Sequence, residues 1–443
     1  MRSPGVNRSS SKPSSKPSSK QSRQQRTERP LMITIRPVPR ALAPVDSAAA
    51  ERISAPNYDE FQSDREIWEL LQRRPQAVLR VTMAHCHTDR FEDVLPDGSE
   101  AALAKAAEEM ARFRESRDTR SVEDILWVYE IVSPRRPELR QIGLGGYART
   151  AEIRTDETPD GTIVRNEGIR PDKAEGRARL IAATDAYIGT VNCAVRDRSG
   201  EMTQALQAHA DARSADFETP DEAGNRHRVW LVQDPADVDR FVQLLANEPA
   251  AYVADGNHRS AAAAALGREH FLAVFFPTDR LHLEPYNRLL PGCGVSAEAM
   301  LERVAGAFDV TSLGDLPGFR PEAVHEIGLY CKSGWYRLVP KPGAFDETDA
   351  AASIDAAIVQ EHILDGVLGL TDARDSRINY VGGNKDASYL KSCVDSGEFA
   401  FALSLAPVTM DQFIAVCEQG RFMPPKSTWF DPKIRSGLVS ALL

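Results

Sequence analysis

A turn between a short apolar segment and an alanine-rich segment contains the residue types of an anion-binding site. Asp255 offers a carboxylate, and His258 and Arg259 offer hydrogen-bond donors. Gly256 permits backbone conformations that other residues avoid, and the following residues 261–266 favour a helix. Because a helix N-terminus presents free N–H groups and a positive dipole end, this turn is suited to a phosphate. The alternative is a plain strand-to-helix turn in which Asp255 caps the helix.

A second charged segment precedes a predicted helix at residues 171–183, which carries proline in its first turn. Glu167 lies between Arg165 and Arg170, and Arg177 follows on the helix. A carboxylate beside several guanidinium groups could hold a general base next to an anion, because arginine matches phosphate oxygens with paired donors. The alternative is a turn whose charges are only solvated.

Three other segments contain residue types that could bind a ligand. Residues 381–385 form a glycine-rich turn but lack the Gly-Lys-Thr/Ser ending of a phosphate-binding loop. Lys426, Ser427 and Thr428 lie in a proline-punctuated loop, where a tight turn is the simpler interpretation. The run His-Cys-His at 85–87 has metal-ligand types, and on a strand its two histidines would share one face. No second pair of ligands is near in sequence, so an edge strand without a metal is expected.

Hydrophobic periodicity predicts a chain in which strands and helices alternate. Strands are expected at residues 33–43, 77–83, 125–132, 141–153, 187–195, 228–232, 250–254, 271–276, 326–332, 334–339, 378–381 and 399–405. Helices are expected at residues 64–72, 101–117, 171–183, 202–211, 234–245, 261–266, 297–307, 353–368, 386–396 and 410–419. The expected fold class is therefore mixed α/β.

Composition divides the chain into three parts. Residues 1–31 are rich in Ser, Lys, Pro, Arg and Gln, so a disordered basic tail is expected there. A Pro/Gly stretch at 291–295 is the best candidate boundary. It would separate a core region at 32–292, which carries both charged turns, from a C-terminal α/β region at 293–443.

Charge and cysteine usage restrict the partners. The formal net charge is -10, although residues 1–30 carry eight Lys or Arg against one Glu. An acidic body argues against nucleic-acid or membrane binding but leaves room for a local basic pocket. The six cysteines are scattered without a Cys-x-x-Cys pair, and the chain shows neither a secretory signal nor a membrane-length apolar run. A cytoplasmic protein with reduced cysteines is expected.

Four segments, taken in order, resemble the domain-of-unknown-function family numbered 1015. They are Asn166-Glu167-Gly168-Ile169-Arg170-Pro171, Ala254-Asp255-Gly256-Asn257-His258-Arg259, Pro285-Tyr286-Asn287-Arg288 and Met423-Pro424-Pro425-Lys426-Ser427-Thr428. The likeness extends from about residue 33 to the C-terminus, and the family is often mentioned beside serine-biosynthesis genes. Its motifs are similar to those of free serine kinases of the ParB/sulfiredoxin-like fold, which implies a core of that fold.

The resemblance to free serine kinases implies roles for individual residues. Glu167 would be the base for the substrate hydroxyl, while Asp255, His258 and Arg259 would hold the nucleotide phosphates, with Mg2+ at Asp255. Further phosphate or nucleotide contacts are expected from Arg170, Arg177, Gly256, Asn257 and Ser260, and secondary contacts from Asn166, Arg288, Lys426, Ser427 and Thr428.

The sequence departs from the family pattern at Asn166 and Asn257, which stand where histidines are usual. Asparagine can donate a hydrogen bond, but it cannot carry charge or shuttle a proton. Three hypotheses therefore stay open. The first is a phosphotransferase that uses Mg2+ and a nucleotide (ATP, ADP or CTP) on a small, serine-like hydroxyl substrate. The second is a non-catalytic nucleotide-binding module of ParB type, and the third is a structural or interaction protein. The oligomeric state is open in all three.

Overall fold

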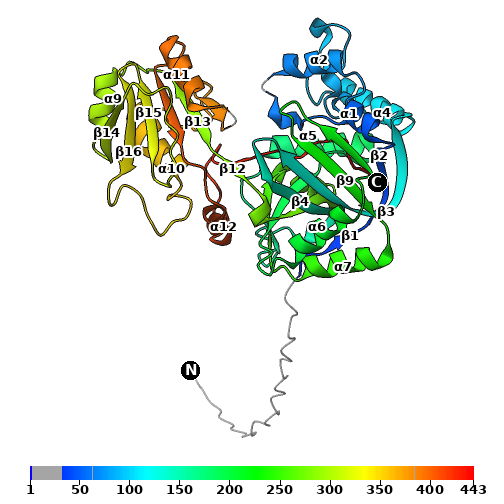
Figure 1. The fold of residues 1–443 in the computed structure, drawn as a ribbon. Coiled ribbons are helices and arrows are strands. Elements are labelled where there is room, and N and C mark those ends of the chain that lie inside the picture. Colours follow the sequence, from blue (N-terminus) through cyan, green and yellow to red (C-terminus); the bar gives the residue numbers. More distant parts are fainter. Residues whose placement is uncertain (2–31, 62, 384) are drawn as a thin grey trace.

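The computed structural model describes residue 1 and residues 32–61, 63–383 and 385–443. Two β-sheets with helices packed against them dominate this described part of the chain (Figure 1). The prediction of a mixed α/β fold with a further C-terminal α/β region is confirmed. The predicted tail at 1–31 lies, except for Met1, outside the described residues, as does one position of the turn at 381–385.

The larger sheet has twelve strands. They are β1 (Ile35–Arg36), β2 (Val38–Pro44), β3 (Thr119–Ser133), β4 (Arg136–Arg149), β5 (Ile163–Arg165), β6 (Ala186–Tyr187), β7 (Val191–Val195), β8 (Phe217–Pro220), β9 (Arg226–Val232), β10 (Ala251–Asp255), β11 (His270–Pro277) and β20 (Ser440–Leu442). The main path runs β5-β10-β7-β11-β4-β3-β2-β20-β6, with β1 on β4 and with β9, then β8, branching from β3. Two neighbouring pairs, β5 with β10 and β7 with β11, are parallel.

The smaller sheet has six strands and is antiparallel between all neighbours. They are β13 (Tyr286–Leu290), β14 (Phe308–Gly314), β15 (Ile327–Cys331), β16 (Gly334–Pro340), β17 (Asn379–Gly382) and β18 (Phe401–Leu405), in the order β14-β16-β15-β18-β13-β17. A two-stranded ribbon of β12 (Leu283–Glu284) and β19 (Trp429–Phe430) lies between the two bodies of the molecule (Figure 1).

Helices flank both sheets (Figure 1). The α-helices are α1 (Ser47–Ile53), α2 (Asp64–Arg73), α3 (Leu79–Thr82), α4 (Glu100–Arg114), α5 (Pro171–Thr184), α6 (Glu201–Ala212), α7 (Pro235–Ala246), α8 (Asn257–Ala265), α9 (Ala297–Val304), α10 (Asp355–Val359), α11 (Ala387–Asp395) and α12 (Met410–Glu418). Short 3-10 helices are η1 (Tyr58–Glu60), η2 (Ala84–Cys86), η3 (Phe91–Asp93), η4 (Thr150–Glu152) and η5 (Thr278–Arg280), and a π-helical turn, η6 (Gln360–Asp365), extends α10.

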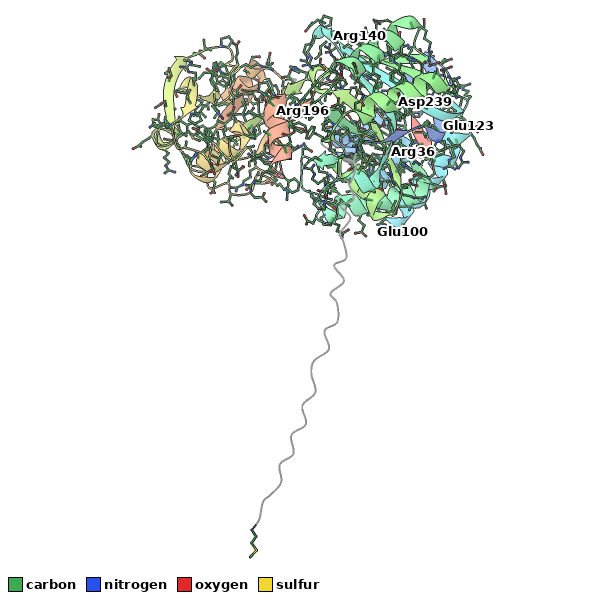
Figure 2. The ribbon with its side chains drawn as sticks, turned by 90° about the horizontal axis from the view of Figure 1, so that it is seen from below. Arg36, Glu100, Glu123, Arg140, Arg196 and Asp239 are labelled. Carbon is green, nitrogen blue, oxygen red and sulfur yellow. The ribbon has the colours of Figure 1, made fainter. Side chains whose placement is uncertain are left out.

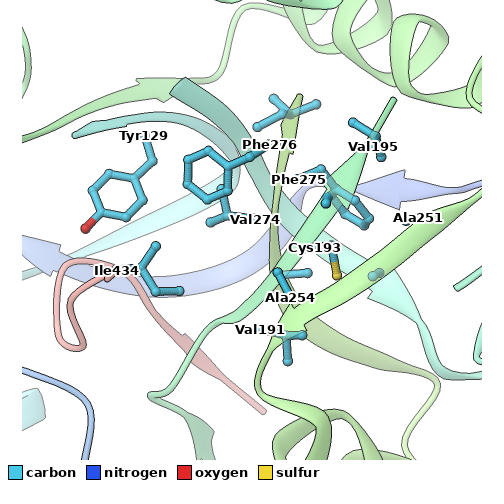
Figure 3. Close-up of a cluster of buried hydrophobic side chains, with 14 of the residues drawn as sticks. Tyr129, Val191, Cys193, Val195, Ala251, Ala254, Val274, Phe275, Phe276 and Ile434 are labelled. Carbon is cyan, nitrogen blue, oxygen red and sulfur yellow. The ribbon is translucent and has the colours of Figure 1, made fainter. Parts of the chain in front are cut away.

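The centre of the larger sheet is the main hydrophobic core. Strand β11 contributes Phe275, which lies among side chains of β7 and β10, and Phe276, whose ring centre lies 6.3 Å from that of Tyr129 on β3 (Figure 3). Every residue of β11 from 271 to 277 is buried, as expected for a strand covered on both faces. This rigid centre holds the ends of β5 and β10 in fixed positions.

Helix starts follow the capping residues in the sequence. The Ser63 side chain accepts a hydrogen bond from the Glu66 N–H, and helix α2 begins at Asp64 as predicted. Pro171 opens α5, also as predicted. Helix α8 begins at Asn257, four residues earlier than expected, with Gly256 in the N-cap position. His258 and Arg259 therefore lie in the first turn of α8.

The strand expected at residues 77–83 is wrong. Residues 79–82 form helix α3, and the His-Cys-His run continues into the 3-10 helix η2. A short apolar run does not distinguish a buried strand from a buried helix, and here the apolar side chains pack into a helical cluster. The strand expected at 187–195 is interrupted, because β6 pairs with β20 while β7 joins β10 and β11.

The last part of the chain returns to the larger sheet. Ala441 of β20 pairs with Ala41 of β2 on one side and with Tyr187 of β6 on the other. Helix α12 is tied to the same body, since Glu418 accepts from the Tyr252 hydroxyl at 2.7 Å and pairs with Arg196 at 3.0 Å. Figure 2 labels Arg196, between the two bodies of the molecule. The division at residue 292 stays a prediction. The pairing of β20 with β2 and β6 shows that the C-terminal end of the chain packs with the N-terminal region.

No helix within residues 32–61, 63–383 and 385–443 combines the length and the apolar character that a membrane span requires.

Candidate functional site

The two charged turns meet because the strands that precede them are parallel neighbours. Val253 of β10 pairs with Arg165, the last residue of β5. Parallel strands end at the same edge of a sheet, where ligands commonly bind. Glu167 therefore follows β5 at the place where Asp255 ends β10.

The turn after β10 is held by an internal ion pair. Nη2 of Arg259 donates to Oδ2 of Asp255 at 2.9 Å, and Nη1 of Arg259 donates to the Thr190 carbonyl. Nζ of Lys433 lies 3.9 Å from the same Asp255 oxygen. Burial alone would raise the pKa of the Asp255 carboxyl, but Lys433 and Arg259 outweigh it and hold this pKa below its usual value. Asp255 is thus a carboxylate between two cations.

The two asparagines that replace histidines bind each other. Nδ2 of Asn257 donates to Oδ1 of Asn166 at 2.7 Å, and both side chains are buried. Within the described residues, Oδ1 of Asn257 has no hydrogen-bond partner. This neutral amide pair links the two turns, and neither member can transfer a proton at neutral pH.

His258 connects the first turn of α8 to the entrance of α5. Its Nε2 accepts a hydrogen bond from the backbone N–H of Arg170 at 3.1 Å. Burial, and then the charge of Arg170, lower the pKa of His258 below its usual value. The imidazole is therefore neutral at pH 7, with the remaining proton on Nδ1.

The C-terminal loop is fixed against the same two turns. The Met423 N–H donates to the Asn166 carbonyl at 2.8 Å. Arg288 is buried and donates to the carbonyls of Tyr286 and Lys426. Burial lowers the pKa of Arg288 to about 10. Arg288 thus positions the loop by its backbone.

A polar pocket of about 700 Å³ opens where these segments converge. Twelve of the residues singled out in the sequence line it: Asn166, Glu167, Arg170, Arg177, Asp255, Gly256, Asn257, His258, Arg259, Lys426, Ser427 and Thr428. Its volume falls in the usual range for small-molecule sites. A second cavity, near Leu180 and Phe271, holds only about 50 Å³ and is mainly apolar, so it is too small for a nucleotide.

A family model described as a protein of unknown function (DUF1015) matches residues 35–362. The chain belongs to the DUF1015 family. The matched range includes both charged turns and the Pro-Tyr-Asn-Arg segment at 285–288, and it ends before the loop at 423–428.

The chain also matches several solved structures at low sequence identity and low TM-score. A free serine kinase in complex with AMP has 11% identity and a TM-score of 0.32, covering 61% of this chain and 83% of that one. SbnI from Staphylococcus aureus, truncated at its C-terminus, has 13% identity and a TM-score of 0.35, covering 65% and 82%. A conserved hypothetical protein from Pyrococcus furiosus has 12% identity and a TM-score of 0.32, covering 62% and 89%. A search of curated proteins finds no match.

Two predicted residues of this DUF1015 protein lie outside the pocket lining. Ser260 is buried, and its hydroxyl donates to the Asn257 carbonyl at 2.9 Å, so it stabilises the first turn of α8. Arg288 is buried behind the loop, as described above. Arg177 lines the pocket, but its guanidinium carbon lies 3.4 Å from the centre of the Tyr58 ring, which orients the side chain by a cation–π contact.

Sequence reasoning missed several lining residues. Lys173 and Lys433 add cations, and Tyr286 adds an aromatic ring. Asp64 and Asp97 add carboxylates at another part of the wall. Lys173 could have been found from its place on the helix after Arg170, since it is one turn from that residue. Lys433 is far from the turns in sequence, and no local signal points to it.

Substitution of Gly256 tests how tightly the turn is built. Gly256 has φ of +99°, and an added Cβ would lie 3.0 Å from Nε of Arg259. Gly256→Ala is therefore expected to lower the free energy of unfolding by roughly 1–3 kcal/mol, because it combines backbone strain with a close contact. Gly267→Ala is the matched control, since φ is +64° there but nothing lies within 4 Å of the added Cβ. Urea unfolding should show the larger loss for Gly256→Ala, and equal losses would contradict the close contact.

Proposed function

We propose that the pocket binds a nucleotide and that the protein transfers a phosphoryl group to the hydroxyl of a small, serine-like substrate. One observation carries this proposal. Glu167 lines the same polar pocket as the helix α8 N-terminus and seven cationic residues, namely Arg170, Lys173, Arg177, Arg259, Arg374, Lys426 and Lys433. A carboxylate base beside a dense cationic wall is the arrangement that transfer to a hydroxyl requires.

The proposed chemistry is an in-line displacement. Glu167 takes the proton of the acceptor hydroxyl as that oxygen attacks the terminal phosphorus, and the nucleotide leaves with the electrons of the broken P–O bond. The cationic side chains and the N–H groups of the first turn of α8 neutralise charge on the phosphate oxygens. His258, neutral and fixed by its bond to Arg170, can offer Nδ1–H to a phosphate oxygen.

A Mg2+ ion at Asp255 does not fit this arrangement well. The Asp255 carboxylate already contacts Arg259 at 2.9 Å and lies 3.9 Å from Lys433. Two cations beside one carboxylate oppose the approach of a third. The proposal therefore contains no step through a metal at Asp255, and the role of this residue is to hold Arg259 and Lys433 in place.

A second candidate function is nucleotide binding without phosphoryl transfer. The specific observation in its favour is the Asn166–Asn257 hydrogen bond, which places a neutral amide pair where ionisable imidazoles are usual in the family. Such a pair keeps the turns together but supplies no proton transfer. The unpartnered Oδ1 of Asn257 would accept a hydrogen bond from a bound ligand under either function.

Thermal denaturation with ATP, ADP, CTP and serine tests ligand binding. A ligand present at 100 times its Kd stabilises the native state by about 2.7 kcal/mol, so a nucleotide should raise the melting temperature measurably. Lys426→Met, which removes an exposed cation of the wall, should reduce this shift. Lys332→Met is the control, because Lys332 is exposed at the hairpin between β15 and β16 and lines no part of the pocket. No shift with any nucleotide at millimolar concentration would favour the structural or interaction protein instead.

A further inference from the structure

Three side chains of metal-ligand type lie together at the rim of the large pocket. Asp64 is the first residue of α2, and His85 and Cys86 belong to η2. One ligand atom from each lies within 4.8 Å of those of the other two. The group is separate from the two charged turns and has no part in the proposed phosphoryl transfer.

The surroundings of His85 explain why a cation suits this position. The His85 side chain is only 2% exposed, and Nε2 lies 3.3 Å from Oδ1 of Asp64 while Nδ1 lies 3.6 Å from Oδ1 of Asp97. A neutral imidazole has one N–H, so it can donate to only one of these carboxylates, and its other lone pair would face the second. A cation bound at Nε2 removes this conflict and leaves Nδ1–H to donate to Asp97.

We propose that Asp64, Nε2 of His85 and Sγ of Cys86 bind one Zn2+ ion, with water in the fourth position. Zinc takes tetrahedral sets of nitrogen, sulfur and oxygen ligands, at about 2.0–2.3 Å. In a tetrahedron of that size, neighbouring nitrogen and oxygen ligands are roughly 3.3–3.5 Å apart, and the distance of 3.3 Å between His85 and Asp64 matches. Asp97 is a positioning residue, because its Oδ1 lies 3.6 Å from Nδ1 of His85 and its charge favours an N–H on that nitrogen, as second carboxylates do around zinc-bound histidines.

Charge and access agree with this site. The negative charges of Asp64 and Asp97 attract a divalent cation, which displaces the thiol proton of Cys86 when it binds. The Asp64 side chain is 52% exposed, so an ion can reach the site from solvent.

His87 is not part of the set. A strand would have placed His85 and His87 on one face, but η2 turns them apart, and Nδ1 of His87 lies 3.5 Å from Oε1 of Glu109. In the sequence, no second pair of ligands lies near His85 and His87, and for that reason no metal was expected there. The fold supplies Asp64 and Asp97 from other segments.

Cobalt titration of the untagged, metal-free full-length protein tests the site. Co2+ substitutes for Zn2+, and a thiolate ligand gives a charge-transfer band in the near ultraviolet. We expect one equivalent of Co2+ to produce this band, and one equivalent of Zn2+ to abolish it. Cys86→Ser should lose the band, whereas Cys293→Ser, which changes an exposed cysteine, should retain it.

Because Cys86 is buried, Cys86→Ser could lose the band through misfolding alone. Two further variants test the site without changing a buried cysteine. Asp64→Asn changes a half-exposed side chain and should weaken Co2+ affinity by at least about tenfold while the melting temperature of the metal-free protein stays unchanged. Asp97→Asn should weaken it by about 10- to 100-fold, because it acts on the orientation of His85. The absence of a thiolate band at excess Co2+, or a band that survives Cys86→Ser, would overturn the proposal.

Discussion

Glu167→Gln is expected to lower kcat for phosphoryl transfer by about 10²- to 10⁴-fold while nucleotide affinity stays nearly unchanged. Glutamine keeps the size of the side chain and its ability to hydrogen-bond, but it cannot accept the proton of the acceptor hydroxyl. The Glu167 side chain is exposed at the pocket, so the exchange should not affect folding. Steady-state kinetics with ATP or ADP and a hydroxyl acceptor give kcat, and calorimetry gives the affinity.

The control for this experiment is Glu175→Gln. Glu175 is an exposed glutamate on α5 that does not line the large pocket, so its exchange for glutamine makes the same chemical change away from the site. Phosphoryl transfer should continue at the wild-type rate in this variant. If Glu167→Gln also transferred phosphate at the wild-type rate, Glu167 could not be the base. A wild-type protein that binds nucleotide but transfers nothing would support the non-catalytic module.

The family resemblance implies that the two charged turns share one site, but the residues alone do not show how they meet. Asp255 and Glu167 each follow a short apolar segment, which is a local pattern. The parallel pairing of β5 with β10, which brings them together, depends on hydrogen bonds between segments about ninety residues apart. Sequence periodicity indicates that a strand exists but does not identify its neighbours.

Arg259 shows how a residue can be found while its role is misjudged. Its chemistry predicted phosphate binding, yet its guanidinium is directed at Asp255 and the Thr190 carbonyl. The helical rule for side chains at i and i+4 does not predict this pair, because Asp255 ends β10 and only Arg259 lies in helix α8. Lys433 is the opposite case, because it reaches Asp255 from the far end of the chain and only the tertiary structure reveals it.

Short apolar segments were the main source of error in the fold. The short apolar run at residues 77–83 predicts a strand, and the structure has helix α3 at Leu79–Thr82. That error also hid the cluster around His85, because the strand would have turned His85 and His87 to the same side. In so short a run, a helix and a strand can bury the same apolar side chains, and local preferences do not separate the two conformations. The packing of α2, α3 and η2 against one another selects the helix.

Arg259→Ala is expected to lower the free energy of unfolding by about 3–5 kcal/mol, which is the usual effect of removing one member of a buried ion pair. The side chains of Arg259 and Asp255 are 8% and 20% exposed, so Asp255 would keep a charge that water can reach only in part. Lys433, 3.9 Å away, compensates for some of this loss and favours the lower end of the range. Urea denaturation followed by tryptophan fluorescence measures the effect.

Arg90→Ala is the matched control for this prediction. Arg90 and Asp93 are also 2.9 Å apart, but their side chains are 71% and 48% exposed, and solvent screening leaves such pairs little effect on stability. Because the pKa of Asp255 is lowered in the folded protein, the pair stabilises the native state above the usual aspartate pKa of about 3.9 and loses this effect as the pH falls through the folded pKa. The difference between wild type and Arg259→Ala should therefore be complete at pH 7 and shrink below about pH 4. Equal losses for Arg259→Ala and Arg90→Ala at pH 7 would show that the Asp255–Arg259 pair does not hold the turn.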